Sequence, residues 1–244
     1  MTKIFLDTAN LEEIEEIKSW GIIEGLTTNQ KIFLNEKGCN FEERAKEILE
    51  KLHPLPVSLE GPNDYEGIIQ AAKEYSDWYT PDGWSLDNIV IKVPMLKSGD
   101  GLRAVKTLSE MNIKTNVTAC MTLNQAFLAA SAGATYISLF YCRMKDWNFE
   151  TYYKGKDAAY RRYAERYALS TISNTMKMLG DFKTKLIIGS IRSPDDITKI
   201  LKMQPDIITI PTKILKQMPF NEKTEATLKE FEEAWKEFKK AEKK

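Results

Sequence analysis

Short runs rich in β-branched residues alternate with longer segments of helical period along the whole of this 244-residue chain. Strands are expected at residues 3–7, 25–29, 55–60, 88–94, 114–118, 134–138, 185–190 and 206–210. Helices are expected at residues 11–20, 41–52, 65–78, 102–111, 123–131 and 157–179, from Pro194, near Thr212, and at 222–239. Eight such alternations at this length predict one (β/α)8 TIM barrel of the α/β class, spanning residues 1–244 as a single domain. Residues 223–244 would form an extra C-terminal helix and a solvated tail.

The main alternative fold is an open, doubly wound sheet. Such a sheet normally carries a glycine-rich phosphate loop directly after its first strand. This chain has Asp7-Thr-Ala-Asn10 there, and Asn10 is a candidate N-cap for the helix that follows. The barrel is therefore the better prediction.

Composition narrows the function classes. Lys+Arg and Asp+Glu number 35 each, so we expect no binding to nucleic acid or to a charged membrane surface. No apolar run reaches about 18 residues, and Asp7 interrupts the N-terminal apolar run too early for a signal peptide. The three cysteines, Cys39, Cys120 and Cys142, form no CxxC motif. We therefore expect a cytoplasmic protein with reduced thiols.

His53 is the only histidine in the chain. A histidine-centred catalytic triad and a histidine-rich metal site are both excluded by this count. Acid–base chemistry would have to come from carboxylates, lysine, tyrosine or water, and we expect neither a metal nor an organic cofactor.

Lys92 interrupts the apolar strand 88–94, which follows a turn at residues 84–87 and ends at Pro94. The strand pattern is typical of burial on both faces in a parallel sheet. A lysine there either extends to solvent or loses part of its charge, because an ammonium ion is costly to bury. A partly neutral lysine is a nucleophile suited to forming a Schiff base with a ketone.

Polar residues end the predicted strands, and the C-terminal ends of barrel strands form the active site in such folds. These residues are Asp7, Asn29, Glu60, Lys92, Asn116 with Thr118, Ser138, Ser190 with Arg192, and Thr209. A single polar strand end is usually a cap or a loop contact. Seven in succession around one lysine indicate a site in which the carboxylates move protons and an iminium accepts electrons.

Two arginines follow the sixth and seventh strands. Arg143 and Arg192 are suited to bind phosphate oxygens, and loops near the last strands of such barrels often hold a phosphate. Arg192 could equally pair with Asp195 or Asp196 at the surface. The residues alone leave both interpretations open.

Eight motifs occur in order and resemble the transaldolase family, in particular its short bacterial and archaeal branch, which is related to fructose-6-phosphate aldolase. They are Asp7-Thr-Ala-Asn10, Thr27-Thr-Asn29, Val57-Ser-Leu-Glu60, Ile91-Lys-Val-Pro94, Asn116-Val-Thr118, Gln125-Ala126, Ala132-Gly-Ala134 and Ser190-Ile-Arg192. The resemblance covers nearly the whole chain. It implies a transferase of carbohydrate metabolism in the pentose phosphate pathway, with sugar phosphates as substrates and a homo-oligomeric assembly.

The resemblance also implies roles for individual residues. Lys92 would form the Schiff base with C2 of a ketose, and Asp7 would transfer the proton of the C4 hydroxyl. Glu60 and Thr118 would hold the catalytic water. The remaining implied substrate-binding residues are Thr28, Asn29, Asn116 and Ser138 near the dihydroxyacetone hydroxyls, with Phe140 beside them, and Arg143, Ser190 and Arg192 at the phosphate.

Two positions distinguish transaldolases from aldolases in this family. Glu60 stands where the aldolases have Gln, and Phe140 stands where they have Tyr, so both choices resemble a transaldolase. Tyr141 is adjacent to Phe140, and a shift of one residue in the register would weaken this distinction. A dihydroxyacetone-releasing aldolase therefore remains the alternative. A non-catalytic sugar-phosphate-binding protein is the alternative from another class, but it would be expected to lack one of the four catalytic residues.

Some segments depart from the family pattern. Gln30 replaces the usual proline, and the segment 138–143 reads Ser-Leu-Phe-Tyr-Cys-Arg. We expect an aromatic loop at 144–156, acting as a lid, an oligomer contact or a packed surface loop. These changes leave open which ketose is used and whether its terminal anion is a phosphate or a sulfonate. The last helix carries an apolar stripe at Leu228, Phe231, Trp235 and Phe238 that would pack on its own barrel or exchange between subunits.

Overall fold

The computed structural model describes residues 1–79, 83, 85 and 87–242. The expected turn before the lysine strand therefore lies partly outside the described residues, at Trp84 and Leu86, and so do the last two residues of the C-terminal tail. None of the helices in the described part of the chain is both long and apolar enough to span a membrane.

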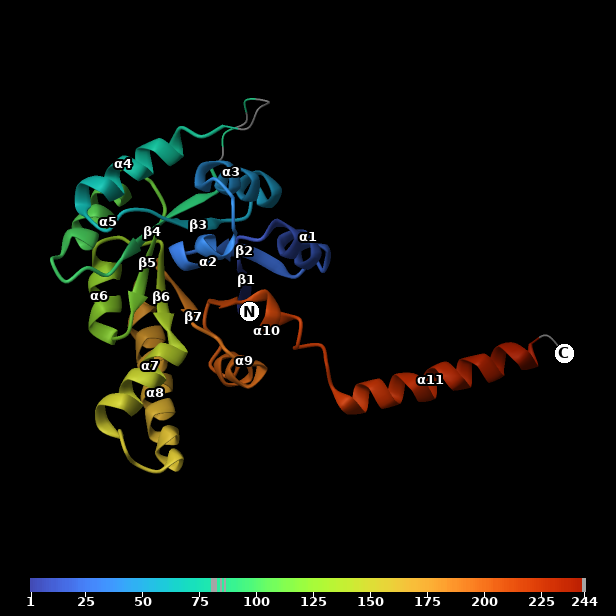
Figure 1. The fold of residues 1–244 in the computed structure, drawn as a ribbon. Coiled ribbons are helices and arrows are strands. Elements are labelled where there is room, and N and C mark those ends of the chain that lie inside the picture. The colour runs from blue at the N-terminus through green and yellow to red at the C-terminus, as the bar shows by residue number, and fades with distance from the viewer. Residues whose placement is uncertain (80–82, 84, 86, 243–244) are drawn as a thin grey trace.

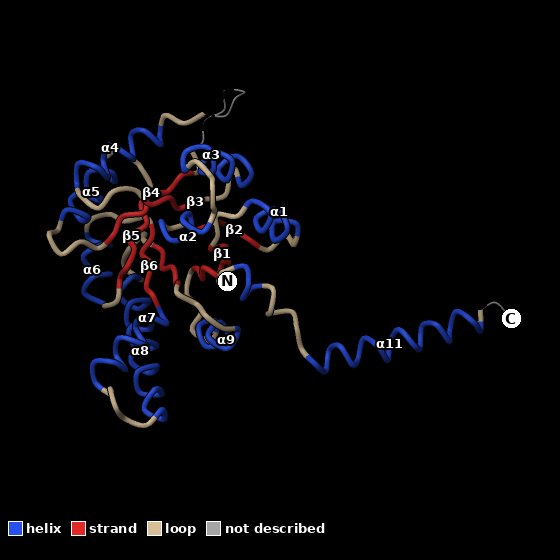
Figure 2. The backbone as a smooth tube through the Cα atoms, in the orientation of Figure 1, coloured by secondary structure: helices blue, strands red, loops and turns tan. Residues whose placement is uncertain are grey.

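Eight strands, all paired in parallel, close into one barrel in which β1 pairs with both β2 and β8 (Figures 1 and 2). The strands are β1 (Lys3–Asp7), β2 (Ile23–Thr27), β3 (Val57–Glu60), β4 (Ile89–Pro94), β5 (Thr115–Cys120), β6 (Tyr136–Phe140), β7 (Lys185–Gly189) and β8 (Ile207–Ile210). The predicted (β/α)8 barrel is confirmed, and each of the eight strands overlaps its expected range, although β2 begins and ends two residues earlier than expected and β6 two residues later.

Helices cover the outside of the barrel (Figure 2). The helices of the described residues are α1 (Leu11–Ser19), α2 (Gln30–Asn35), α3 (Phe41–Leu52), α4 (Tyr65–Ser76), α5 (Asp100–Glu110), α6 (Leu123–Ser131), α7 (Tyr141–Tyr152), α8 (Arg161–Leu179), α9 (Pro194–Leu201), α10 (Thr212–Leu215) and α11 (Glu222–Ala241), of which α11 does not cover the barrel, with a 3-10 turn at Ala158–Tyr160 before α8. Local signals begin several of them: the Asn10 side chain accepts the amide hydrogen of Glu13, and Pro194 opens α9.

The interior of the barrel changes from apolar to polar along the strand direction. Phe5, Ile187 and Ile207 pack together at the N-terminal end, and the Phe5 ring leaves no room for a Cβ at Gly25. Side chains on one face of a strand recur every two residues, so Asp7 lies above Phe5 and Thr209 above Ile207. The same period that builds the apolar floor thus places polar groups at the C-terminal ends of the strands.

Two segments expected without regular structure are helical. The expected aromatic loop at 144–156 is wrong for most of its length, because α7 runs to Tyr152. Tyr141, Cys142, Met144 and Asn148 are buried on one side of α7, at helical spacing, where α7 packs against α8. The connection before α3 contains the short helix α2, which Asn29 caps by accepting the amide hydrogen of Ile32.

Helix α11 extends away from the barrel as a separate arm (Figure 1). Its apolar residues Leu228, Phe231, Trp235 and Phe238 are between 52% and 65% exposed. The expected packing of this stripe on its own barrel is therefore wrong.

Candidate active site

Lys92 is buried inside the barrel on β4, with 5% of its surface exposed. Its ammonium Nζ donates a hydrogen bond to the backbone oxygen of Thr28 at 2.6 Å and lies 3.8 Å from Glu60 Oε2. Burial lowers the pKa of Lys92 below its ordinary value, although the charges of Glu60 and Asp7 oppose this shift. The sequence left two interpretations open: a lysine that extends to solvent, or a lysine that loses part of its charge. The structure fits the second, because Lys92 does not extend to bulk solvent.

Asp7 faces the same space from β1. The hydroxyl of Thr27 donates to Asp7 Oδ1 at 2.8 Å, and the hydroxyls of Thr27 and Thr209 lie 2.6 Å apart. Burial raises the pKa of Asp7, while the charge of Lys92 and the Thr27 hydrogen bond act to lower it. A carboxyl balanced in this way is suited to accept and return a proton.

Glu60 ends β3 beside Lys92, and the two residues are register partners in the β3–β4 ladder. Burial raises the pKa of Glu60, against the opposing effects of Lys92 and of a hydrogen bond from Gln30. The lysine and both carboxyls are thus all shifted toward their uncharged forms. Proton exchange among the three groups is easier for that reason.

A buried hydrogen-bond chain crosses the barrel on the other side of Lys92. The hydroxyl of Ser138 donates to Asn116 Oδ1 at 2.8 Å, and the Asn116 amide donates to Ser58 Oγ at 3.1 Å. Thr28 is also buried, but its hydroxyl donates to the backbone oxygen of Ser58, so its contribution to the lysine is its own carbonyl oxygen.

Thr118 ends the polar layer on β5. Its Oγ1 is buried and has no hydrogen-bond partner among the described residues. The next residue, Ala119, has a φ of 59°, and Ser190 after β7 has a φ of 62°. Two non-glycine residues in the left-handed region at the same end of the barrel indicate backbone held in place by its surroundings, as is common at functional sites.

These groups surround two adjoining cavities of about 420 and 120 Å³, which we call together the lysine cavity. Both are lined by Asp7, Asn29, Lys92, Phe140 and Arg143. The larger one adds Gln30, Lys31, Ile32, Asn35, Glu60, Thr118 and Ala119, and the smaller one adds Thr27, Ser138, Gly189, Ser190 and Thr209. The structure therefore brings together most of the site residues that the sequence predicts.

The two predicted phosphate-binding arginines face different spaces. Arg143 lines the lysine cavity, with its guanidinium 5.7 Å from the centre of the Phe140 ring. The Arg192 guanidinium instead pairs with Asp146 Oδ2 at 2.6 Å and lines a third cavity, of about 480 Å³, between α7, α8 and α9. We call this the outer cavity. Only the backbone amide of Arg192 bonds Asp196, so neither side-chain pairing weighed from the sequence is present.

Phe140 and Tyr141 lie in different surroundings. Phe140 ends β6 and lines the lysine cavity. Tyr141 begins α7 and is fully buried, with its hydroxyl donating to Glu165 at 3.0 Å on the outer side. The residue at the cavity is thus the phenylalanine, without a shift of register.

Several residues of the cavity are not among the predicted site residues, and two of them bear directly on its charges. Thr27 is the hydrogen-bond donor to Asp7, and Lys31 adds a cation to the cavity wall. The alternation of β2 could have indicated Thr27, because it lies two residues before Asn29 on the same face. Lys31 is the second residue of α2, two positions after the Asn29 cap, and has no comparable signal.

An amine of lowered pKa between two carboxyls, next to a hydroxyl without a partner, can form an imine with a carbonyl compound and move protons around it. In the part of the chain that the structure describes, no group of three or more His, Cys, Asp or Glu side chains is arranged to hold a metal ion.

The comparisons with known proteins identify the family of the chain. A family model described as transaldolase/fructose-6-phosphate aldolase matches residues 4–244. A probable transaldolase from Carboxydothermus hydrogenoformans is 41% identical over 97% of this chain and 99% of its own length. Probable transaldolases from Thermoanaerobacter sp. (strain X514) and Thermoplasma acidophilum are 39% and 36% identical, each over 96% of this chain and over 96% and 95% of their own lengths.

Among solved structures, a putative fructose-1,6-biphosphate aldolase from Coccidioides immitis superposes with a TM-score of 0.54 at 10% identity, over 88% of this chain and 78% of that one. This likeness supports the barrel fold alone. The family match and the relatives, each covering nearly the whole sequence, establish that the chain belongs to the transaldolase/fructose-6-phosphate aldolase family.

Proposed function

We propose that this protein is a Schiff-base transaldolase that transfers a dihydroxyacetone unit from a ketose phosphate, such as fructose 6-phosphate or sedoheptulose 7-phosphate, to an aldose phosphate. The observation that carries the proposal is the position of Lys92, buried between Asp7 and Glu60 with a pKa lowered by burial. That is the environment in which a lysine becomes a nucleophile at neutral pH.

In the first half-reaction the neutral Lys92 amine attacks C2 of the ketose, and loss of water gives an iminium. The Asp7 carboxylate takes the proton of the C4 hydroxyl. The C3–C4 bond then breaks, its electron pair passes to the iminium to give an enamine on Lys92, and the shortened aldose leaves.

In the second half-reaction C3 of the enamine attacks C1 of the acceptor aldose, and Asp7 returns its proton to the new hydroxyl oxygen. Water held by Glu60 and Thr118 then hydrolyses the iminium. The unpartnered, buried Oγ1 of Thr118 supports this role, because a buried hydroxyl without a partner is costly unless a water or ligand satisfies it.

The hydroxyls of the dihydroxyacetone unit would bind Asn29, Asn116 and Ser138. Asn116 and Ser138 are already linked by a 2.8 Å hydrogen bond, so their orientation is set before substrate binds. The terminal phosphate would lie toward Arg143 and Ser190, which line the lysine cavity. Arg192 would reach it only after leaving Asp146.

The alternative within the family is an aldolase that releases free dihydroxyacetone. Phe140 at the cavity argues against it, because no tyrosine hydroxyl is offered there to position water on the enamine intermediate. A sulfonate in place of the phosphate would be compatible with the same cations. A binding protein without turnover is disfavoured, because Asp7, Glu60, Lys92 and Thr118 are all present at the cavity.

The test is mass spectrometry after borohydride treatment with fructose 6-phosphate, with and without erythrose 4-phosphate. A dihydroxyacetone-sized adduct on Lys92 that decreases when the acceptor is added is the expected result. Release of dihydroxyacetone at the same rate without acceptor would favour the aldolase. No adduct in folded protein would refute the fructose 6-phosphate assignment and direct attention to other anionic ketoses.

We also propose that the protein is a homo-oligomer and that helix α11 contributes to its assembly. The support is the arm-like position of α11 and the exposure of its four large apolar residues (Figure 1). A stripe of this kind is costly to leave in water. Replacing Phe231 and Trp235 by Ser should reduce the mass measured by light scattering; an unchanged mass would refute the contribution of α11.

A further inference from the structure

The lysine cavity carries three cations on its walls: Lys31, Lys92 and Arg143. Lys92 is the buried nucleophile and is already engaged with the Thr28 carbonyl. Lys31 and Arg143 are exposed and come from opposite sides of the barrel, Lys31 from α2 after β2 and Arg143 from α7 after β6. Within the described residues, neither has a carboxylate at ion-pair distance, whereas Arg192 has Asp146 at 2.6 Å. The charge available to a ligand at the cavity mouth is therefore that of Lys31 and Arg143.

The acidic residues of the cavity do not cancel these two charges. Asp7 and Glu60 lie deep, next to Lys92, and burial raises the pKa of both. In the inner part of the cavity the two carboxyls therefore face the Lys92 amine, whereas the exposed Lys31 and Arg143 have no carboxylate partner among the described residues. An anionic group on a substrate whose carbonyl reaches Lys92 would be drawn to the mouth.

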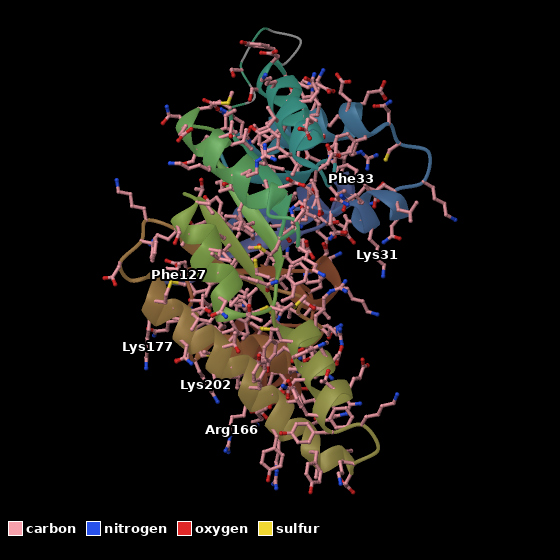
Figure 3. All side chains as sticks on the ribbon, turned by 90° about the vertical axis from the view of Figure 1, so that its left-hand side faces the viewer. Lys31, Phe33, Phe127, Arg166, Lys177 and Lys202 are labelled. Carbon is pink, nitrogen blue, oxygen red and sulfur yellow. The ribbon has the colours of Figure 1, made fainter. Side chains whose placement is uncertain are left out.

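The position of Lys31 is held by the structure around α2. Asn29 caps the helix, the Gln30 side chain donates to the backbone oxygen of Gly61 at 3.3 Å, and the Phe33 ring packs 4.8 Å from the Phe41 ring. Figure 3 shows Lys31 and Phe33 together on this segment, far from Lys177 and Arg166 on the outer helix α8. Lys31 is thus a lysine on an anchored backbone at the rim of the cavity.

We propose that Lys31 is a specificity residue that binds the terminal phosphate of the sugar substrate, together with Arg143. This inference rests on the proposed transaldolase function and deepens it, since it names a residue outside the motifs that carry the family resemblance. A phosphate monoester carries about −1.5 to −2 charge at neutral pH, which two cations on opposite sides of the mouth neutralise. The substrate then spans the cavity, with its carbonyl at Lys92 and its phosphate between Lys31 and Arg143.

The experiment compares the variants Lys31→Gln, Lys31→Arg and Lys37→Gln with the unchanged protein. Lys37 lies six residues further along the same connection, is also exposed and lines none of the three cavities, so it controls for the loss of one surface charge. Two readouts are used: the KM for fructose 6-phosphate, and binding of inorganic phosphate by calorimetry, which does not require turnover.

Lys31→Gln should raise the KM for fructose 6-phosphate and the Kd for inorganic phosphate by about fivefold each, the size expected for a charge pair at a solvated rim. Its kcat should stay within about twofold, because binding is weakened without a change at the reacting atoms. Lys31→Arg should restore both values, and raised salt should shrink the difference. Trapping of free dihydroxyacetone, which has no phosphate, should be equal in all variants.

Equal phosphate affinity in Lys31→Gln and the unchanged protein would overturn the proposal, as would an equal loss in Lys37→Gln. The outcome for the proposed function is separate. If phosphate binding depends on Lys31 but no imine is trapped, the proposed anion site is supported and the proposed transaldolase reaction is refuted. If imines form but the phosphate affinity does not depend on Lys31, the proposed reaction is supported and Lys31 is a solvated surface lysine.

Discussion

The lysine cavity and the outer cavity are built from the same kinds of residue but hold their charges in opposite ways. In the lysine cavity, burial lowers the pKa of Lys92 and raises that of Asp7 and Glu60. In the outer cavity, Lys145 lies 2.8 Å from Asp196, and Lys199 lies 2.7 Å from Glu165. There the pKa values of Asp196 and Glu165 are lowered by their hydrogen bonds, and that of Lys199 is raised.

The difference follows from geometry. In the outer cavity each lysine finds a carboxylate within direct contact distance, so the charged forms are stabilised. In the lysine cavity the nearest carboxylate oxygen is 3.8 Å from Lys92, and desolvation outweighs attraction. The outer cavity, at about 480 Å³, is larger than either part of the lysine cavity, at about 420 and 120 Å³, yet Lys145, Lys199 and Arg192 on its walls already have carboxylate partners. Unsatisfied titratable groups, rather than cavity size, identify the reactive site.

The largest effect is expected from replacing Lys92 of the lysine cavity, with Lys145 of the outer cavity as the control. Lys92→Met should abolish borohydride trapping and lower kcat/KM at least about a thousandfold, because it removes the buried amine whose pKa is lowered by burial. Its thermal stability should not fall, since a buried ammonium is replaced by an apolar chain of similar length. Lys145→Met should trap substrate normally. An adduct on another lysine in Lys92→Met would contradict the assignment of the nucleophile.

The next largest effect is expected from Glu60, the carboxylate nearest to Lys92, which we propose as the nucleophile. The charge of Glu60 raises the pKa of Lys92, so Glu60→Gln should lower it further. The measurement is the rate of borohydride trapping as a function of pH. The acid limb of this profile should move to lower pH. Turnover should still drop by about a hundredfold or more, because the group that handles water and protons is lost. A limb that moves to higher pH would show that Glu60 does not act on Lys92 by charge.

A smaller effect is expected at Thr27, which we interpret as a positioning residue for Asp7. Its hydrogen bond lowers the pKa of Asp7, so Thr27→Val should raise that pKa. If Asp7 must be ionised to take the C4 hydroxyl proton, the acid limb of kcat/KM should move to higher pH, with about a tenfold loss at neutral pH. Thr27→Ser keeps the hydroxyl and should restore the profile. A uniform loss at every pH, not restored by Ser, would indicate a packing role only.

The smallest effect on catalysis is expected in the outer cavity. Asp196→Asn should destabilise the fold by about 1–3 kcal/mol at neutral pH, because it removes the partner of Lys145. The folded pKa of Asp196 lies below 3.8, so its contribution is present above that value and is lost as pH falls through the folded pKa. The difference in denaturant midpoint between the unchanged protein and the Asp196→Asn variant should therefore disappear at acid pH. A gap independent of pH would contradict the ionic origin.

Much of the site can be predicted from the sequence because its residues occupy recurrent positions. Asp7 and Glu60 end their strands, and Lys92 and Thr118 each lie two residues before a strand end. Local patterns reveal these strands, and the closed barrel then brings their C-terminal ends together. Thr27 and Lys31 are harder to predict. One acts through a contact with a distant strand, and the other follows a cap whose short helix has no buried residue to mark it.

The sequence by itself determined the alternation of strands and helices, the cap at Asn10, the helix start at Pro194 and a lysine inside a buried strand, since these depend on residues only a few positions apart. The tertiary structure decided which partner each basic side chain contacts. It turned Arg192 toward Asp146, gave Lys92 the Thr28 carbonyl and carried α11 away from its own barrel. Such pairings depend on packing between distant segments and on the desolvation that packing imposes, and neither quantity is encoded locally.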